Sequence, residues 1–122
     1  MATLNGQSKL LRVFVGELDK WQHRPFYEAV LRRAKDQGMA GATVIKGVLS
    51  YGSSSILHSS KLLDISEDLP MIVELIDTEE KIRAFAGQVS EMFEEAGCGG
   101  IITLEAAEVV YHKPLRGRRD VL

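Results

Sequence analysis

The chain contains one pattern twice: a segment rich in β-formers, a helical segment, a Gly-x-x-Gly turn and a second β-rich segment. The turn consists of residues 38–41 in the first copy and residues 97–100 in the second copy. Glycine allows left-handed or crowded backbone conformations that a side chain forbids, so both turns can be tight. The duplicated pattern therefore predicts the order βαββαβ.

Four segments predict strands, because β-branched and aromatic residues are enriched in them. These segments are residues 9–16, 43–49, 69–76 and 101–111. Pro25 suits the first turn of a helix that ends at Gly38. Asp77 and Glu80 have the spacing of a capping box at the start of a second helix, which Gly97 ends. This order is typical of the α+β, ferredoxin-like plan, in which a four-stranded antiparallel sheet carries both helices on one face.

The second helix has the clearest periodicity in the chain. Apolar residues recur along it at steps of three and four, which predicts a stripe that packs into the core. The stripe consists of Ile82, Phe85, Ala86, Val89, Met92, Phe93 and Ala96. Each large side chain contributes roughly 1.5–3 kcal/mol when it is buried, so this helix is expected to anchor the core.

The sheet face opposite the helices is expected to be apolar, with one charged residue near the centre of each strand. In the usual strand order of this plan, 4-1-3-2, the charges read across the sheet as Glu105, Arg12, Glu74 and Lys46. They alternate in sign, as cross-strand pairing favours. A face this apolar is an aggregation hazard in a monomer. We therefore expect other copies of the chain to cover it; the alternative is a monomer whose charged face meets water.

Size and composition indicate a single domain. The chain has 122 residues, 45% of them hydrophobic, and a net charge of -2. It can therefore form one core, and its charge does not favour nucleic acid or anionic membranes. No apolar run reaches the roughly 18–20 residues that span a bilayer. A single cysteine, Cys98, indicates a reducing compartment, and we expect a cytoplasmic protein. The expected organisation is a flexible leader over residues 1–8, one domain over residues 9–112 and a basic tail over residues 113–122.

Residues 51–68 form a long connection in which no strand is evident and a short helical turn is expected near residues 60–65. The connection begins at Tyr51 and includes His58 among several serines. A connection of this length is rare in a small domain unless it is functional or mobile. We expect it to contact a ligand or a partner protein.

Four motifs are specific in combination. They are Arg-Val-Phe-Val-Gly-Glu from Arg12, Pro-Phe-Tyr-Glu-Ala from Pro25, Gly-Met-Ala-Gly-Ala-Thr-Val from Gly38 and Ser-Glu-Asp-Leu-Pro from Ser66. Together they resemble the trimeric PII signalling proteins and, more closely, a PII-like bacterial family labelled a domain of unknown function. The resemblance covers about residues 9 to 112. It implies a homotrimer whose sheets face a common centre, with clefts between neighbouring subunits.

In PII proteins these clefts bind adenine nucleotides, and the long loop changes shape with the ligand and contacts a target protein. The resemblance implies an adenine nucleotide such as AMP, ADP, ATP or a cyclic nucleotide, or a similar anionic ligand, and a target protein such as a membrane transporter or channel. The ligand-binding residues that it implies are Gly41, Ala42, Thr43, Gly47, Gly97, Gly99, Gly100, Arg116 and Arg118. The first three match the turn at the base and ribose, and Gly47 matches the strand-two glycine near the ligand. The glycines at positions 97, 99 and 100 match the phosphate-side loop, and the two arginines would close the cleft. The long connection adds Tyr51 and His58 as expected ligand contacts.

The chain departs from the PII pattern at two places. PII proteins usually carry Asp and then Lys in the phosphate-side loop, where this chain has Cys98 and Ile101. The loss of a cationic phosphate partner argues against a triphosphate. Tyr51 stands at the entrance of the long loop and not at its tip, so the modified tyrosine of PII proteins has no evident match.

The residues give little support to catalysis or metal binding. Cys98 follows a helix C-terminus, whose partial negative charge does not favour a thiolate. The three histidines lack the spacing of a zinc site, and no basic stripe with interleaved aromatic residues indicates nucleic-acid binding. We therefore predict a non-enzymatic regulatory protein without catalytic or metal-binding residues. A structural or metal-handling trimer like the CutA proteins, without nucleotide binding, is the alternative, and an enzyme that uses the same cleft is the third.

Overall fold

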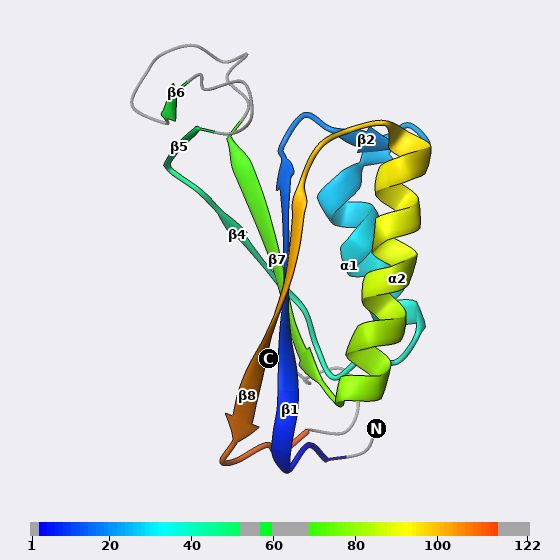
Figure 1. Cartoon of the computed structure of the whole chain (residues 1–122), viewed down its shortest axis with the longest axis vertical. Coiled ribbons are helices and arrows are strands. Elements are labelled where there is room, and N and C mark those ends of the chain that lie inside the picture. Colours follow the sequence, from blue (N-terminus) through cyan, green and yellow to red (C-terminus); the bar gives the residue numbers. More distant parts are fainter. Residues whose placement is uncertain (1–2, 52–56, 60–68, 115–122) are drawn as a thin grey trace.

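The computed structural model describes residues 3–51, 57–59 and 69–114 (Figure 1). The elements are β1 (Gly6–Gly16), β2 (Lys20–Trp21), β3 (Arg24–Pro25), α1 (Phe26–Asp36), β4 (Thr43–Lys46), β5 (Leu49–Tyr51), β6 (Leu57–Ser59), β7 (Pro70–Asp77), α2 (Glu79–Ala96) and β8 (Ile101–Val109). Four strands form one antiparallel sheet in the order β4-β7-β1-β8. Both the α+β, ferredoxin-like plan and the 4-1-3-2 strand order are thereby confirmed.

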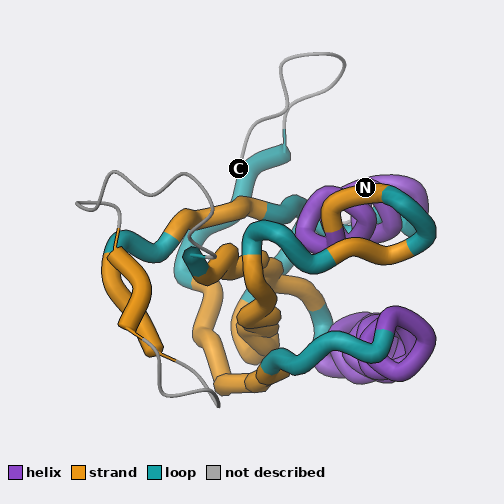
Figure 2. The backbone as a smooth tube through the Cα atoms, turned by 90° about the horizontal axis from the view of Figure 1, so that it is seen from above, coloured by secondary structure: helices purple, strands orange, loops and turns teal. Residues whose placement is uncertain are grey.

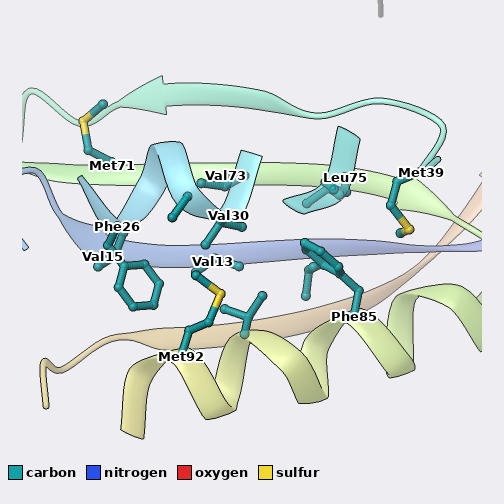
Figure 3. Close-up of a cluster of buried hydrophobic side chains, with 14 of the residues drawn as sticks. Val13, Val15, Phe26, Val30, Met39, Met71, Val73, Leu75, Phe85 and Met92 are labelled. Carbon is teal, nitrogen blue, oxygen red and sulfur yellow. The ribbon is translucent and has the colours of Figure 1, made fainter. Parts of the chain in front are cut away.

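Both helices lie on one face of the sheet, as the view from above shows (Figure 2). Alternate residues of β1 and β7 point toward them, among them Val13 and Val73, which are completely buried. In Figure 3 these strand side chains lie between α1 and α2, which contribute Val30 and Met92. The core therefore fills the space between the sheet and the helix pair.

Helix α2 packs as its periodicity predicts. Its buried residues are Ile82, Phe85, Val89 and Met92. The remaining members of the stripe are partly buried against the same core. The ring of Phe93 stacks on the ring of Phe26 with a centroid distance of 4.5 Å, which joins α2 to the start of α1. Gly97 ends the helix in the left-handed conformation, with φ of 70°, which glycine adopts without a steric penalty.

The N-cap of α2 corrects the sequence prediction. The cap is Thr78, whose side chain accepts a hydrogen bond from the backbone N–H of Lys81 at 3.3 Å. Asp77 does not cap the helix because it lies in β7, and its carboxylate binds backbone N–H groups of Ala40 and Thr78. The predicted N-cap is therefore wrong by one residue, and the expected capping box is wrong because Lys81, and not Glu80, stands three residues after the cap.

Strand β1 begins earlier than expected. Gly6, Gln7 and Ser8 pair with Val109, Glu108 and Ala107 of β8 in the same register as the rest of the strand. The prediction of a flexible leader over residues 1–8 is therefore wrong for residues 6–8, because partners on β8 satisfy their backbone groups. Opposite Gly6, β8 stops at Val109, two residues before the predicted boundary.

The structure corrects the prediction for residues 43–51 and 57–59. The predicted edge strand is shorter than expected, and part of the predicted strandless connection forms a hairpin. The predicted strand over residues 43–49 stops at Lys46. The Gly47 N–H still donates to the carbonyl of Pro70 at 2.8 Å, but Pro70 has no N–H that could donate in return. The chain resumes as β5, which pairs with β6, so the expectation of no strand in residues 51–68 is wrong for residues 57–59. Residues 52–56 and 60–68, including the expected helical turn, lie outside the described part.

Candidate functional site

The turn before β4 is held by backbone contacts to both halves of the chain. Gly38 has a φ of 70°, and the N–H of Met39 donates to the carbonyl of Ala34 at 3.1 Å. The N–H of Ala40 then donates to Oδ2 of the buried Asp77 at 2.9 Å. These contacts fix the path of Gly41 and Ala42, both half-buried, and leave Thr43 exposed at the start of β4. The three residues predicted to meet a ligand are therefore presented by a rigid turn.

Gly47 is packed directly against β7. A Cβ atom at this position would lie 2.6 Å from Cγ of Pro70, closer than real Cβ contacts allow. Together with the hydrogen bond to the Pro70 carbonyl, this contact gives Gly47 a structural reason to lack a side chain. Its predicted place near a ligand stays a prediction.

The glycines after α2 differ from one another in their surroundings. A Cβ atom on Gly100 would lie 2.4 Å from ring atoms of Phe93 and 2.5 Å from the carbonyl oxygen of Phe14. A Cβ atom on Gly97 or Gly99 would meet nothing within 4 Å. Gly100 is thus required by packing and Gly97 by its positive φ, whereas no steric contact requires glycine at position 99.

The structure divides the described members of the predicted site into two groups. Gly41, Ala42, Thr43 and Gly47 flank β4, and the glycines at 97, 99 and 100 lead into β8. Strands β4 and β8 are the two edges of the sheet, separated by β7 and β1. Three strand spacings of about 4.8 Å amount to roughly 14 Å. A single chain therefore does not bring the two groups together.

Tyr51 and His58 lie on the β5–β6 hairpin, which stands apart from the main sheet in Figure 1. The Tyr51 side chain is 71% exposed, and His58 pairs with Ser50 in the hairpin register. Both residues follow β4 in the chain, beyond its Gly47 end. Arg116 and Arg118 lie outside the described residues.

The open face, by which we mean the sheet face opposite the helices, carries a charged cluster. Arg12 Nε donates to Oε2 of Glu74 at 2.7 Å, and Arg12 Nη1 donates to Oε1 of Glu105. The hydrogen bond to Glu74 is the main cause that raises the pKa of Arg12. The cluster carries one positive and two negative charges, so one carboxylate is not neutralised.

Lys46 is not part of this cluster, which corrects the predicted row of four charges. It pairs with Met71 in the sheet register, so it points to the helix side of β4, the side of Val44. Its Nζ lies 3.1 Å from Oε2 of Glu17. The correction has a simple cause: apolar residues occupy both faces of this edge strand, so its sequence did not separate the faces.

Large apolar side chains surround the charged cluster on the open face. Ile45, Ile76 and Ile101 are 44%, 39% and 61% exposed, respectively. The register places Ile45 and Ile101 in one row with Ile72 and Phe14. In the described part of the chain no helix covers this face (Figure 2). An apolar surface that crosses a whole sheet is typical of a protein–protein contact.

Cys98 is a poor nucleophile in its surroundings. Burial of the thiol, followed by the negative charge of Asp19, raises its pKa, and only a backbone hydrogen bond opposes them. The described residues also contain no group of three or more His, Cys, Asp or Glu side chains that can hold a metal ion. The small residues of the predicted site, among them Gly41, Ala42 and Gly99, can offer a ligand hydrogen bonds from backbone groups and close contact.

The β2–β3 hairpin was not predicted from the sequence. Lys20 and Trp21 pair with Pro25 and Arg24 across a turn in which Gln22 and His23 have positive φ values of 50° and 68°. Neither residue is a usual turn former, so the residue types gave no signal of a turn. Trp21, the single tryptophan of the chain, lies close in sequence to the basic residues Lys20 and Arg24. This proximity was the one feature of the segment that could have indicated a surface site.

Comparison with known proteins identifies relatives across nearly the whole length of the domain. The model of the DUF190 family, described as an uncharacterized ACR, matches residues 8–109. A UPF0166 protein of Aquifex aeolicus is 39% identical over 105 residues, which cover 86% of this chain and 95% of that protein. A UPF0166 protein of Methanocaldococcus jannaschii is 30% identical over 91 residues, which cover 75% of this chain and 83% of that protein.

The fold is similar to that of solved PII-like structures. CPII of Thiomonas intermedia K12, a nitrogen regulatory PII-like protein bound to ADP, AMP and bicarbonate, has a TM-score of 0.61 at 19% identity, covering 84% of this chain and 88% of CPII. A second CPII structure, bound to ADP and bicarbonate, has a TM-score of 0.55 at 23% identity, with the same coverage of both chains. The suspected PII-like relationship is thereby confirmed at the level of the fold. None of the described helices is long and apolar enough to cross a membrane.

Proposed function

The chain belongs to the DUF190 family, and we propose that it is a PII-like regulatory protein that binds a small adenine nucleotide between the subunits of a homotrimer. It acts without catalysing a reaction and works in the cytoplasm, where Cys98 stays a free thiol. The ADP and AMP bound to CPII support the ligand class. Residues 51–68, which include the exposed Tyr51, would meet a target protein such as a membrane transporter or channel.

One observation carries this proposal: the predicted ligand-binding residues lie on opposite edges of one sheet. The Gly41–Thr43 turn and Gly47 flank β4, whereas the glycines at 97, 99 and 100 lead into β8. A cleft that uses both groups needs the β4 edge of one copy next to the β8 edge of another. Such a head-to-tail contact closes into a ring when the rotation between copies is 120°, as in a trimer.

The apolar open face supports assembly by a separate argument. Its exposed isoleucines from β4, β7 and β8 would lose contact with water in an assembly whose sheets face a common axis. Burial of apolar area contributes roughly 25 cal/mol per Å². The assembly would therefore stabilise the fold at the same time as it forms the clefts.

The first test is native mass spectrometry of freshly purified protein, followed by calorimetric titration with AMP, ADP, ATP, cyclic AMP and divalent metals. We expect trimers and saturable binding of at least one nucleotide. A stable monomer, or binding of metals without any nucleotide, would overturn the proposal in favour of the other function classes.

A mixing experiment tests whether each site is shared between copies. Thr43→Glu and Gly99→Glu each add a carboxylate to one edge, at an exposed position or one with free space. Each variant alone should lose nucleotide binding. When the two are unfolded together and refolded at equal amounts, about one quarter of the clefts should combine two unmodified edges and bind again. No recovery in trimers that contain both variants would contradict a shared site.

A further inference from the structure

A cavity lies on the helix side of the molecule, on the opposite layer from the open face. Its volume is about 320 Å³. The β2–β3 hairpin contributes Trp21 and Arg24 to its wall, and α1 contributes Arg32, Arg33, Asp36 and Gln37. A volume of this size is at the lower end of the range of small-molecule sites. The cavity is formed by one chain and uses neither sheet edge.

The cavity wall has an excess of positive charge. Three guanidinium groups face one carboxylate, that of Asp36. Within the described residues, Arg24 and Arg32 make no ion pair or side-chain hydrogen bond, and both are exposed. Guanidinium groups bind phosphate or carboxylate with two parallel hydrogen bonds. Two such groups without protein partners are therefore available to an anion.

The remaining residues of the wall are held in place by contacts with one another and with α2. The Cζ atom of Arg33 lies 5.3 Å from the centroid of the Trp21 ring, a cation–π distance. The indole Nε1–H of Trp21 donates to Oε2 of Glu95 at 3.1 Å. Gln37 and Gln88 exchange hydrogen bonds at the other end of the cavity. An ordered wall lowers the entropic cost of binding a ligand.

The hairpin that presents Trp21 and Arg24 is strained. Its two turn residues, Gln22 and His23, both have positive φ values, although two-residue turns of this kind strongly favour Asn and Gly. Non-glycine residues in this conformation are uncommon and cluster at functional sites. The strained turn pairs Arg24 with Trp21 across the hairpin, and both residues line the cavity.

We propose that this cavity binds a small soluble molecule that carries a phosphate group on an aromatic or apolar body. Arg24 and Arg32 hold the phosphate oxygens, and the Trp21 indole and the Ala29 methyl group contact the body of the ligand. Asp36 accepts a hydrogen bond from a hydroxyl group of a ligand that has one. This site is separate from the inter-subunit nucleotide site and does not depend on it.

The test uses phenyl phosphate, with inorganic phosphate as a second probe. Trp21 is the single tryptophan of the chain, so its fluorescence reports on this cavity. We expect a saturable fluorescence change with phenyl phosphate and weaker binding of inorganic phosphate. The double variant Arg24→Gln/Arg32→Gln should bind phenyl phosphate at least about tenfold more weakly. The matched control, Lys81→Gln/Arg83→Gln, removes two positive charges from the exposed surface of α2 and should bind as the unmodified protein does.

Circular dichroism establishes that both double variants are folded, and phosphorus NMR line broadening of phenyl phosphate gives a readout independent of Trp21. No saturable response in either measurement would overturn the proposal. Equal weakening in the two double variants would also overturn it, because it would reduce the effect to net charge. Co-sedimentation with phosphatidic acid vesicles without a response to the soluble probes would overturn the assignment to a soluble ligand.

Discussion

The carboxylate of Asp77 accepts a hydrogen bond from the backbone N–H of Ala40, with a distance of 2.9 Å between Oδ2 and N. Its other oxygen, Oδ1, accepts from the N–H of Thr78 at 2.7 Å. Asp77 ends β7 in the second half of the chain, and Ala40 lies in the turn that leads to β4 in the first half. One buried side chain thus ties the turn before Gly41 to the start of α2.

Replacement of Asp77 by Ala should lower the free energy of unfolding by about 2–3 kcal/mol, since it removes a charged acceptor and leaves the N–H of the buried Ala40 without a partner. Urea denaturation at one fixed protein concentration measures the change. Glu91→Gln on the exposed face of α2 is the control and should stay within about 0.5 kcal/mol. Equal stability of the Asp77→Ala and control variants would show that these hydrogen bonds make no net contribution to the free energy of unfolding.

The glycines before β8 offer a matched pair of substitutions. Gly100→Ala places a methyl group 2.5 Å from the Phe14 carbonyl oxygen, and because backbone cannot move aside, it should cost about 1–3 kcal/mol of stability. Gly99→Ala meets nothing within 4 Å and should be neutral or stabilising by a few tenths of a kcal/mol. Thermal unfolding of both variants side by side measures the difference. A reversed order would mean that the path of this turn differs from the one described.

The sequence predicted the features of the fold that depend on long patterns. The stripe on α2 spans several helical turns, so its burial followed from spacing alone. Strand order and the pairing of Arg12 with Glu74 and Glu105 followed from the duplicated plan, and the ion pairs are observed. Lys46 was misplaced because Val44 and Ile45 make both faces of its strand apolar, which leaves no alternation to identify the core side.

Features that depend on one or two backbone angles were not predictable. Thr78 and Asp77 are both good N-caps by residue type, and the choice between them depends on Ala40, a residue 37 positions away from Asp77. The turn at Gln22 and His23 lacks the Asn-Gly or Asp-Gly pair that marks such turns in a sequence, and tertiary contacts such as that of Trp21 with Glu95 accompany it. Within the candidate site, the two Gly-x-x-Gly motifs predicted the turns. They did not indicate that the two turns occupy opposite edges of the sheet.

Cys98 should react slowly with iodoacetamide. Burial and the charge of Asp19 raise its pKa, so less thiolate is present at pH 8 than for free glutathione, and the rate should still be rising above pH 9. Asp19→Asn removes the second of these causes but keeps an acceptor for the Gly16 N–H, which lies 3.0 Å from Oδ2. This variant should therefore shift the rate profile partway toward lower pH. A thiol that reacts as fast as glutathione at pH 8 would contradict the assignment.

Arg12 should control assembly through the open face. Arg12→Gln leaves Glu74 and Glu105 without a counter-charge on the surface that is proposed to meet other copies. We expect the dissociation constant of the assembly to rise by at least about tenfold, because an unpaired charge opposes burial. Arg83→Gln removes the same charge from the exposed surface of α2, where the partner is Glu79, and should leave assembly unchanged. Sedimentation equilibrium over a series of concentrations distinguishes the two variants. If Arg12→Gln assembles like the unmodified protein at pH 7, the open face does not form the contact between copies.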